Sequence, residues 1–95
     1  MKGGKGNCRE YEENHLIFEG EYLNGKRNGK GKEYIPLNGN IRFEGEYLNG
    51  KRNGKGKEYD NHGELLFEGE YLNGKRNGKG KEYNEYGELE FEGEF

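Results

Sequence analysis

The sequence has 95 residues, of which 27% are hydrophobic and 37% are charged. That length suits one small domain, and the scarcity of apolar side chains argues against a thick two-layer core. The net charge of -3 comes from 16 basic and 19 acidic side chains that are interleaved, so no global field indicates a nucleic-acid partner.

Aromatic residues separate this sequence from a disordered one. Low hydrophobicity, high charge and 19 glycines are typical of disorder. Eight Tyr and five Phe, however, recur at fixed offsets, a regularity that disordered chains lack. The lone cysteine, Cys8, cannot form an internal disulfide, and no secretory, transit or long apolar segment is visible. We therefore expect a folded protein in a reducing, cytoplasmic compartment.

An internal repeat dominates the sequence. The phrase FEGEYLNGKRNGKGKEY occurs three times without change, at Phe18–Tyr34, Phe43–Tyr59 and Phe67–Tyr83. Its spacing of 25 and then 24 residues is typical of a repeat array. We expect one repeat domain over residues 1–95, with a half repeat at 1–17, repeats at 18–42, 43–66 and 67–90, and a half repeat at 91–95.

Each copy of the phrase opens with a strand pattern. Phe18, Gly20 and Tyr22 alternate with Glu and Leu residues, which is the period of two of a strand with one aromatic face. A glycine weakens a strand unless its bare backbone makes room for a bulky neighbour. We therefore expect an aromatic ring to lie across Gly20 and, in the following strand, across Gly31.

Turn signals follow the strand. The segment at Asn24–Gly29 contains two Asn-Gly steps, which readily adopt the positive φ angles of tight hairpin turns. Phe18–Tyr34 is therefore predicted to form one β-hairpin. The connectors between copies carry further turn formers at Asn38-Gly39, His62-Gly63 and Tyr86-Gly87.

The pattern as a whole predicts an all-β fold. Each phrase is rich in glycine, lacks alanine and has no apolar spacing of three and four, so helix is disfavoured. Successive hairpins would form an elongated single-layer antiparallel sheet, a meander that lengthens with each repeat. One hairpin buries too little apolar surface to offset its ordering entropy, so we expect the repeats to fold only when they are stacked.

The residues Phe-Glu-Gly-Glu-Tyr, Asn-Gly-Lys-Arg-Asn-Gly and Gly-Lys-Gly, in this order and at this period, resemble the MORN (membrane occupation and recognition nexus) repeat family over nearly the whole chain. Tyr34 lies three residues after Gly31, where many units have two, and Tyr22 stands where tryptophan is common. The chain therefore resembles the variant type of unit. The resemblance implies a slightly curved antiparallel sheet that serves as a scaffold, with roles in protein binding, oligomerisation and contact with membrane phospholipids.

The two ends of the sequence resemble incomplete units. Gly3–Tyr11 is similar to the second half of a unit, and Phe91–Phe95 to the first half. Both outer strands would then lack a partner, and open edges are templates for pairing with another chain. Two interpretations stay open: the chain is a piece of a longer array, or copies join end to end as a homo-oligomer.

The aromatic face is the candidate protein-binding surface. A single sheet has no second layer, so we expect part of this face to stay uncovered. Rings with basic neighbours could also stack single-stranded nucleic acid, but packing against the sheet itself is the favoured interpretation. The protein-binding candidates are Phe18, Tyr22, Phe43, Tyr47, Phe67 and Tyr71.

The basic residues suggest an alternative function. Twelve of the 16 lie in the three predicted turn regions, which would form a column along one side of the sheet. Such a column could bind the phosphates of anionic lipid, as a peripheral membrane module does. Solvated turn charges balanced by nearby glutamates are the simpler interpretation. The lipid-phosphate candidates are Lys26, Arg27, Lys51, Arg52, Lys75 and Arg76.

Catalytic and cofactor chemistry has little support in the sequence. Gly25–Lys32 lacks the spacing and the Ser or Thr of a phosphate-binding loop. Cys8, His15 and His62 do not have the spacing of metal ligands. The recurring glutamate pairs occupy identical environments, whereas acid–base catalysis needs unlike ones. We predict a non-catalytic scaffold without metal, cofactor or nucleic acid, which binds an unknown protein and could associate with itself through its open edges.

Overall fold

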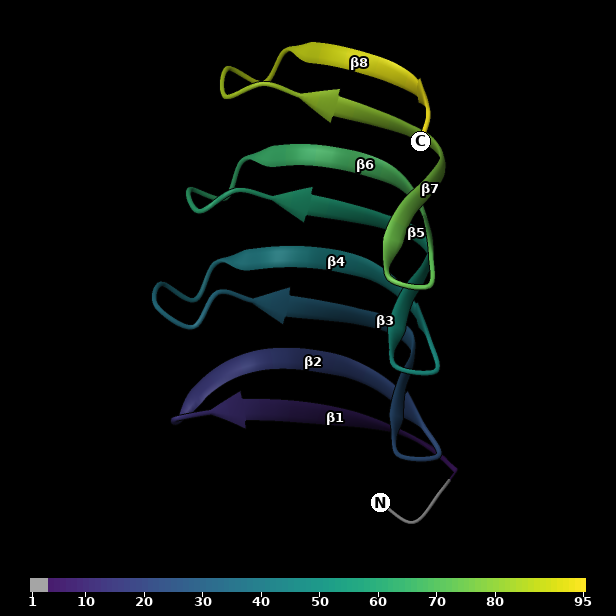
Figure 1. Ribbon diagram of the computed structural model, residues 1–95. Coiled ribbons are helices and arrows are strands. Elements are labelled where there is room, and N and C mark those ends of the chain that lie inside the picture. Colours follow the sequence, from purple (N-terminus) through teal and green to yellow (C-terminus); the bar gives the residue numbers. More distant parts are fainter. Residues whose placement is uncertain (1–3) are drawn as a thin grey trace.

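The computed structural model describes residues 4–95, which form one open antiparallel sheet of eight strands in sequence order (Figure 1). None of these residues is helical, so the predicted all-β meander is confirmed. Of the predicted first half repeat, Met1 to Gly3 lie outside the described residues. The strands are β1 (Lys5–Glu12), β2 (His15–Leu23), β3 (Lys26–Tyr34), β4 (Ile41–Leu48), β5 (Lys51–Tyr59), β6 (Leu65–Leu72), β7 (Lys75–Tyr83) and β8 (Leu89–Glu94).

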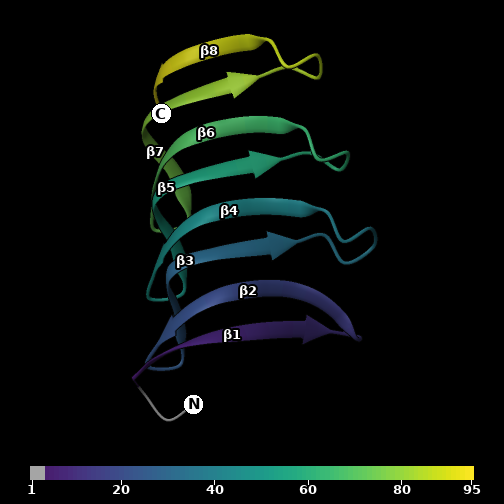
Figure 2. The same cartoon turned by 180° about the vertical axis from the view of Figure 1, so that it is seen from behind.

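The sheet is elongated and curved. Its principal extents are 44 × 29 × 14 Å. The tight turns that join β2 to β3, β4 to β5 and β6 to β7 lie along one side, and the wider connectors lie along the other (Figures 1 and 2). Because there is only one layer, each buried side chain must be covered by residues of the same sheet.

The first Asn-Gly step of each phrase forms the predicted hairpin turn. Asn24 and Gly25 have φ angles of 52° and 81°. Both are positive, as a two-residue type I′ turn requires. The same positive φ angles recur at Asn49-Gly50 and Asn73-Gly74.

The second Asn-Gly step has a different role from the one predicted. Asn28 and Gly29 lie inside β3, and the pairing of β2 with β3 shifts register between Gly20 and Tyr22. This shift is a β-bulge, which leaves a backbone group without a partner in the ladder. The Glu21 carboxylate satisfies one such group by accepting the main-chain N–H of Lys30 at 2.7 Å. The step therefore marks a bulge and not a turn.

The connectors contain the predicted turns. Two amides of the first connector, Asn38 and Asn40, each donate an N–H to the carbonyl oxygen of Asn61 in the second connector, at 3.1 Å. The first and second connectors are thus joined directly. The predicted turn glycines have positive φ angles: Gly39, Gly63 and Gly87.

Main-chain bonds also tie each hairpin turn to the repeat before it. The N–H of Gly50 donates to the carbonyl oxygen of Arg27 at 2.8 Å, and the N–H of Gly74 donates to that of Arg52 at 2.8 Å. The Asn28 side-chain oxygen accepts the N–H of Asn49 at 3.2 Å. The first and second repeats therefore contact each other at both ends of the strands as well as along them.

Gly45→Ala is expected to lower the free energy of unfolding by about 3 kcal/mol, because overpacking displaces backbone here. A Cβ at Gly45 would lie 2.5 Å from the Lys55 carbonyl oxygen and 2.6 Å from the Gly56 Cα. Gly93→Ala is the matched control, since the nearest atom to its Cβ is the Phe91 Cζ at 3.0 Å, on an edge strand. Its loss should be about 1 kcal/mol or less. Urea denaturation followed by circular dichroism measures both, and equal losses would contradict the close approach of β4 and β5.

Candidate functional site

A buried row of aromatic rings runs along one face of the sheet. Phe18, Phe43 and Phe67 have no exposed surface, and Tyr47 and Tyr71 are 4% exposed. The ring centroids of Phe18 and Tyr47 are 5.2 Å apart and those of Phe43 and Tyr71 are 5.1 Å apart, both edge to face. Aromatic quadrupoles favour this geometry. The row therefore crosses the seams between repeats.

Each of these phenylalanines is enclosed from two sides. Beneath Phe18 lie Gly20 and Gly31, and a Cβ on Gly31 would come within 2.5 Å of the ring. This confirms the prediction that a ring crosses the glycines. Above the ring, the guanidinium carbon of Arg27 lies 4.1 Å from its centroid, a cation–π contact. In the next two repeats, Arg52 covers Phe43 at 4.1 Å and Arg76 covers Phe67 at 4.2 Å.

A carboxylate two strands away, in the preceding unit, holds each arginine in place. Glu33 accepts hydrogen bonds from Arg52 Nε at 2.9 Å and Nη2 at 3.0 Å, and from the Tyr47 hydroxyl at 2.6 Å. Burial by itself would raise the pKa of Glu33, but the hydrogen bonds from Arg52 and Tyr47 outweigh it and hold the pKa below its usual value. The same arrangement joins Glu10 to Arg27 and Tyr22, and Glu58 to Arg76 and Tyr71.

These contacts change the interpretation of the aromatic candidates. We expected part of the row to be uncovered, and this is wrong for five of the six rings, which are buried. Only Tyr22 is half-buried. The arginines cover the face that a partner would otherwise reach. The aromatic side chains with substantial exposure in this row lie in and beside β8, where Phe91 is 45% and Phe95 is 38% exposed.

The basic candidates also divide into two kinds. Lys26, Lys51 and Lys75 are the first residues of β3, β5 and β7 and are exposed. The following residues, Arg27, Arg52 and Arg76, are part of the aromatic face and already pair with glutamates. The expectation that all twelve basic residues lie in turns is therefore wrong, because the strands begin directly after the Asn-Gly step.

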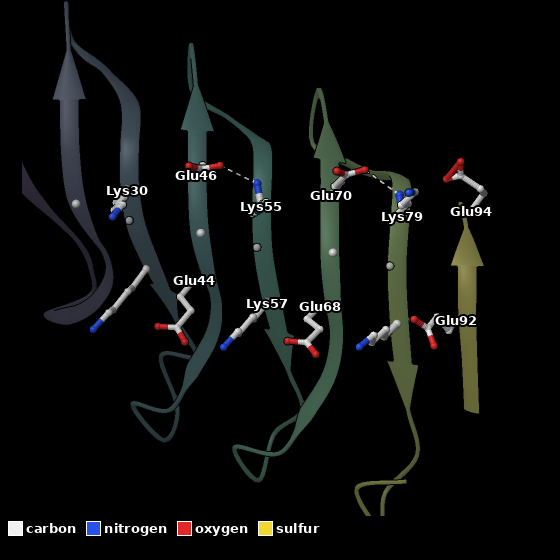
Figure 3. A pocket seen from close by; sticks show the side chains of 18 of the residues that line it. Lys30, Glu44, Glu46, Lys55, Lys57, Glu68, Glu70, Lys79, Glu92 and Glu94 are labelled. Atoms are coloured by element: carbon white, nitrogen blue, oxygen red, sulfur yellow. Dashed lines mark hydrogen bonds between the residues drawn. The ribbon is translucent and has the colours of Figure 1, made fainter. Parts of the chain in front are cut away.

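The opposite face carries a long open groove (Figure 3). Its floor is the bare backbone of the paired strand glycines, such as Gly31, Gly45 and Gly56. On either side of the floor, lysines and glutamates alternate from strand to strand. One row contains Lys30, Glu46, Lys55, Glu70, Lys79 and Glu94, and the other contains Lys32, Glu44, Lys57, Glu68, Lys81 and Glu92.

The lysines of this groove form no salt bridge within the described part of the chain. Every salt bridge among residues 4–95 involves an arginine, so the lysine ammonium groups have no carboxylate partner there. The glutamates are partly engaged: Glu44 accepts the Tyr59 hydroxyl at 2.5 Å, and Glu46 accepts the main-chain N–H of Lys55 at 2.8 Å. Burial and the bond to Glu44 raise the pKa of Tyr59 to about 12.

Sequence reasoning missed this groove, although its signal was present. The phrase places Glu on both sides of Gly20 and Lys on both sides of Gly31. Side chains alternate between the faces of a strand, so once the aromatic rings are assigned to one face, these charges must share the other. The pattern was missed because these lysines were assigned to turns, whereas they lie inside β3, β5 and β7.

The remaining polar candidates lie apart. Cys8 is in β1, His15 begins β2 and His62 is in the second connector. Residues 4–95 contain no group of His, Cys, Asp and Glu that could hold a metal ion. A search of the same residues for a helix able to cross a membrane found none.

Comparison with sequence models of protein families finds the MORN repeat at three segments, residues 18–36, 43–64 and 67–84. Each match begins at the phenylalanine that opens a copy of the phrase, and together the matches cover more than half of the chain. A search of curated proteins gave no match.

The free energy of unfolding is expected to fall at both ends of the pH scale. The folded pKa of Glu33 and that of Glu58 are depressed below 4.5, so the stability they provide is present above that pH and is lost as pH falls through the folded values. The pKa of Tyr34 and that of Tyr59 are raised from 10.0 to about 12, so their contribution is lost as pH rises through that window.

Urea denaturation across pH tests this expectation. The double variant Glu33→Gln/Glu58→Gln removes both carboxylates and should show a shallower loss below pH 4.5. Its alkaline loss should persist, because Tyr34 and Tyr59 bond to Glu19 and Glu44, which the variant leaves in place. An acid limb that the double variant leaves unchanged would contradict the role of these carboxylates.

Proposed function

Because the chain belongs to the MORN repeat family, we propose that it is a non-catalytic scaffold that binds other proteins. MORN repeats are non-enzymatic units that act as interaction scaffolds for proteins and membranes. The single observation that carries the proposal is the groove opposite the aromatic row, which crosses seven strands and presents unpaired lysines above a glycine floor.

The form of the groove supports a polypeptide as its ligand. The floor is backbone, because the side-chain positions of Gly31, Gly56 and Gly80 point to the aromatic face, and an extended chain can follow this strip between the two rows of charges. The two rows carry both signs of charge in alternation, which suits a ligand of mixed charge better than a uniform polyanion. Free ammonium groups then favour carboxylates of that ligand at the positions nearest to the lysines.

The double variant Lys55→Glu/Lys57→Glu should abolish binding of the partner, because it reverses both charges at the centre of the groove. Co-purification of the tagged chain from the cells that express it measures retention. The matched control is Lys26→Glu/Lys51→Glu, which makes the same change in net charge at exposed lysines outside the groove. A partner lost equally from both variants, or retained by both, would contradict the groove as the binding surface.

A second candidate function is that of a peripheral membrane module. It is supported by Lys26, Lys51 and Lys75, which are exposed and lie beside successive hairpin turns on one side of the sheet (Figure 1). Each lysine near an anionic surface contributes about 1 kcal/mol of attraction. The three arginines of the predicted column add less, because their guanidinium groups are already bound to glutamates.

Liposome sedimentation separates the two functions. The membrane module predicts that vesicles with anionic lipid retain the chain at low salt, that retention fades as salt rises, and that Lys26→Glu/Lys51→Glu/Lys75→Glu abolishes it. Neutral vesicles are the control. Absence of retention on anionic vesicles at low salt would eliminate the membrane function and leave the protein scaffold.

A further inference from the structure

Charge on the groove face is arranged in stripes that follow the strands (Figure 3). The lysine stripes are Lys30 and Lys32 on β3, Lys55 and Lys57 on β5, and Lys79 and Lys81 on β7. The glutamate stripes between and beside them are Glu44 and Glu46 on β4, Glu68 and Glu70 on β6, and Glu92 and Glu94 on β8. The groove runs across the strands, so a ligand lying in it meets positive and negative charge in turn.

The lysine stripes recur at every second strand. Lys32 lies opposite Glu44, and Glu44 lies opposite Lys57 on its other side. Neighbouring strands of a sheet are about 4.8 Å apart, so the lysine stripes repeat at about 9.6 Å. The backbone ladder sets this distance, because each repeat contributes two strands. The groove therefore has a fixed period that a ligand has to match.

The glutamates of β2, β4 and β6 already accept hydrogen bonds from within the sheet. In each unit one of them accepts a tyrosine hydroxyl and the other a main-chain N–H, as Glu44 and Glu46 do. The groove lysines, by contrast, form no salt bridge among residues 4–95. An incoming carboxylate therefore gains a partner at a lysine stripe, whereas one placed over a glutamate stripe is repelled.

The width of the strip between the two rows of charge disfavours a helical ligand. Lys30 and Lys32 are two residues apart on one strand, which corresponds to about 6.7 Å. An α-helix with its side chains is about 10–12 Å wide, so it would rest on the charged side chains and not on the floor. Two of its turns advance about 10.8 Å, which falls out of step with the lysine stripes. An extended chain fits the strip better.

Among extended conformations, polyproline II has the period of the groove. It has three residues per turn and rises 3.1 Å per residue, so side chains on one face repeat at about 9.3 Å. Over the two intervals between the three lysine stripes, the difference accumulates to about 0.6 Å. Side chains on one face of a β-strand repeat at about 6.7 Å, which is out of step by about 2.9 Å at the second stripe.

The floor of the groove offers a ligand no free ladder of main-chain groups. Gly45 of β4 is paired with Gly31 of β3 on one side and with Gly56 of β5 on the other, and such bonds lie between the strands. A ligand therefore gains no main-chain bonds from a β conformation here. Polyproline II needs none, because its backbone stays solvated, and a preformed polyproline II chain loses little entropy on binding.

We propose that the groove binds a polyproline II segment of a partner protein that carries an acidic side chain at every third residue. Three such side chains reach the lysine stripes of β3, β5 and β7. The two residues between successive acids pass over a glutamate stripe and are not acidic. The proposal rests on the protein-binding function and specifies the ligand of the same groove.

Labelled peptides of equal composition test the spacing by fluorescence anisotropy against the whole chain at low salt. The peptide PPEPPEPPEPP has its acids at every third residue, PEPPPEPPPEP at every fourth, and PPPPEEEPPPP in one cluster. We expect the first to bind about tenfold more tightly than the other two, a difference of about 1.4 kcal/mol. The peptide GGEGGEGGEGG keeps the spacing of three but loses the preformed conformation, so it should also bind more weakly than the first.

A double-mutant cycle locates the central contact. In PPEPPQPPEPP glutamine replaces the middle glutamate, which should weaken binding to the original chain about fivefold, as loss of an exposed ion pair does. In the variant Lys55→Gln/Lys57→Gln the two peptides should bind equally, because the stripe that the middle glutamate faces is neutral. The control Lys26→Gln/Lys51→Gln changes exposed lysines outside the groove and should preserve the fivefold difference. Circular dichroism checks that each variant retains the sheet.

The outcomes separate the ligand from the function of the groove. Equal affinity for the three peptides of the same composition would show that only net charge matters and would overturn the proposal. Equal affinity for the glycine peptide, absence of binding by PPEPPEPPEPP, or a fivefold difference that persists in Lys55→Gln/Lys57→Gln would overturn it too. If partner retention in co-purification still depends on Lys55 and Lys57 in such a case, the protein-binding function stands without the polyproline II ligand.

Discussion

The structure depends on one contact, a phenylalanine ring held between two glycines and an arginine. A single-layer sheet has no second layer to exclude water, yet Phe43 is fully buried because Gly45 and Gly56 let its ring pack closely against the backbone and Arg52 covers it. The arginine in turn is fixed by a glutamate of the preceding repeat. The ring and its cover come from adjacent strands, the anchor comes from the preceding repeat and a second ring, Tyr71, from the following one, so the buried interior depends on neighbouring repeats. A chain with few apolar residues can therefore bury its rings because the repeats supply contacts to one another.

The sequence allowed most of the fold to be predicted. The hairpin was predicted from two patterns, the period of two in Phe18, Gly20 and Tyr22 and the first Asn-Gly step. The structure confirms both the strand and the turn. The second Asn-Gly step was misinterpreted, because the same dipeptide suits a turn and a bulge, and only the pairing of Glu21 with the Lys30 N–H distinguishes them. The cover over the rings could not be predicted, since it depends on where the Arg27 side chain points once the strands are in register.

Charge is divided between the two faces according to residue type. The arginines Arg27, Arg52 and Arg76 bind glutamates and rings on the aromatic face, where a planar cation can stack and form two parallel hydrogen bonds. The lysines remain available on the groove face and beside the turns. One set of basic residues thus stabilises the sheet while the other presents a surface, which is why counting positive charge along the sequence overstates what is available to a ligand.

Perfect copies bring a hazard that the first connector addresses. Three identical phrases could exchange places during folding, and strand ladders displaced by one whole unit would retain nearly the same backbone bonds. The side-chain amides of Asn38 and Asn40 have no counterpart in the other two connectors, so their bonds to the Asn61 carbonyl give the first seam contacts that the second seam lacks. This pair of amides therefore distinguishes the first seam from the second in a ladder whose strands are otherwise nearly identical.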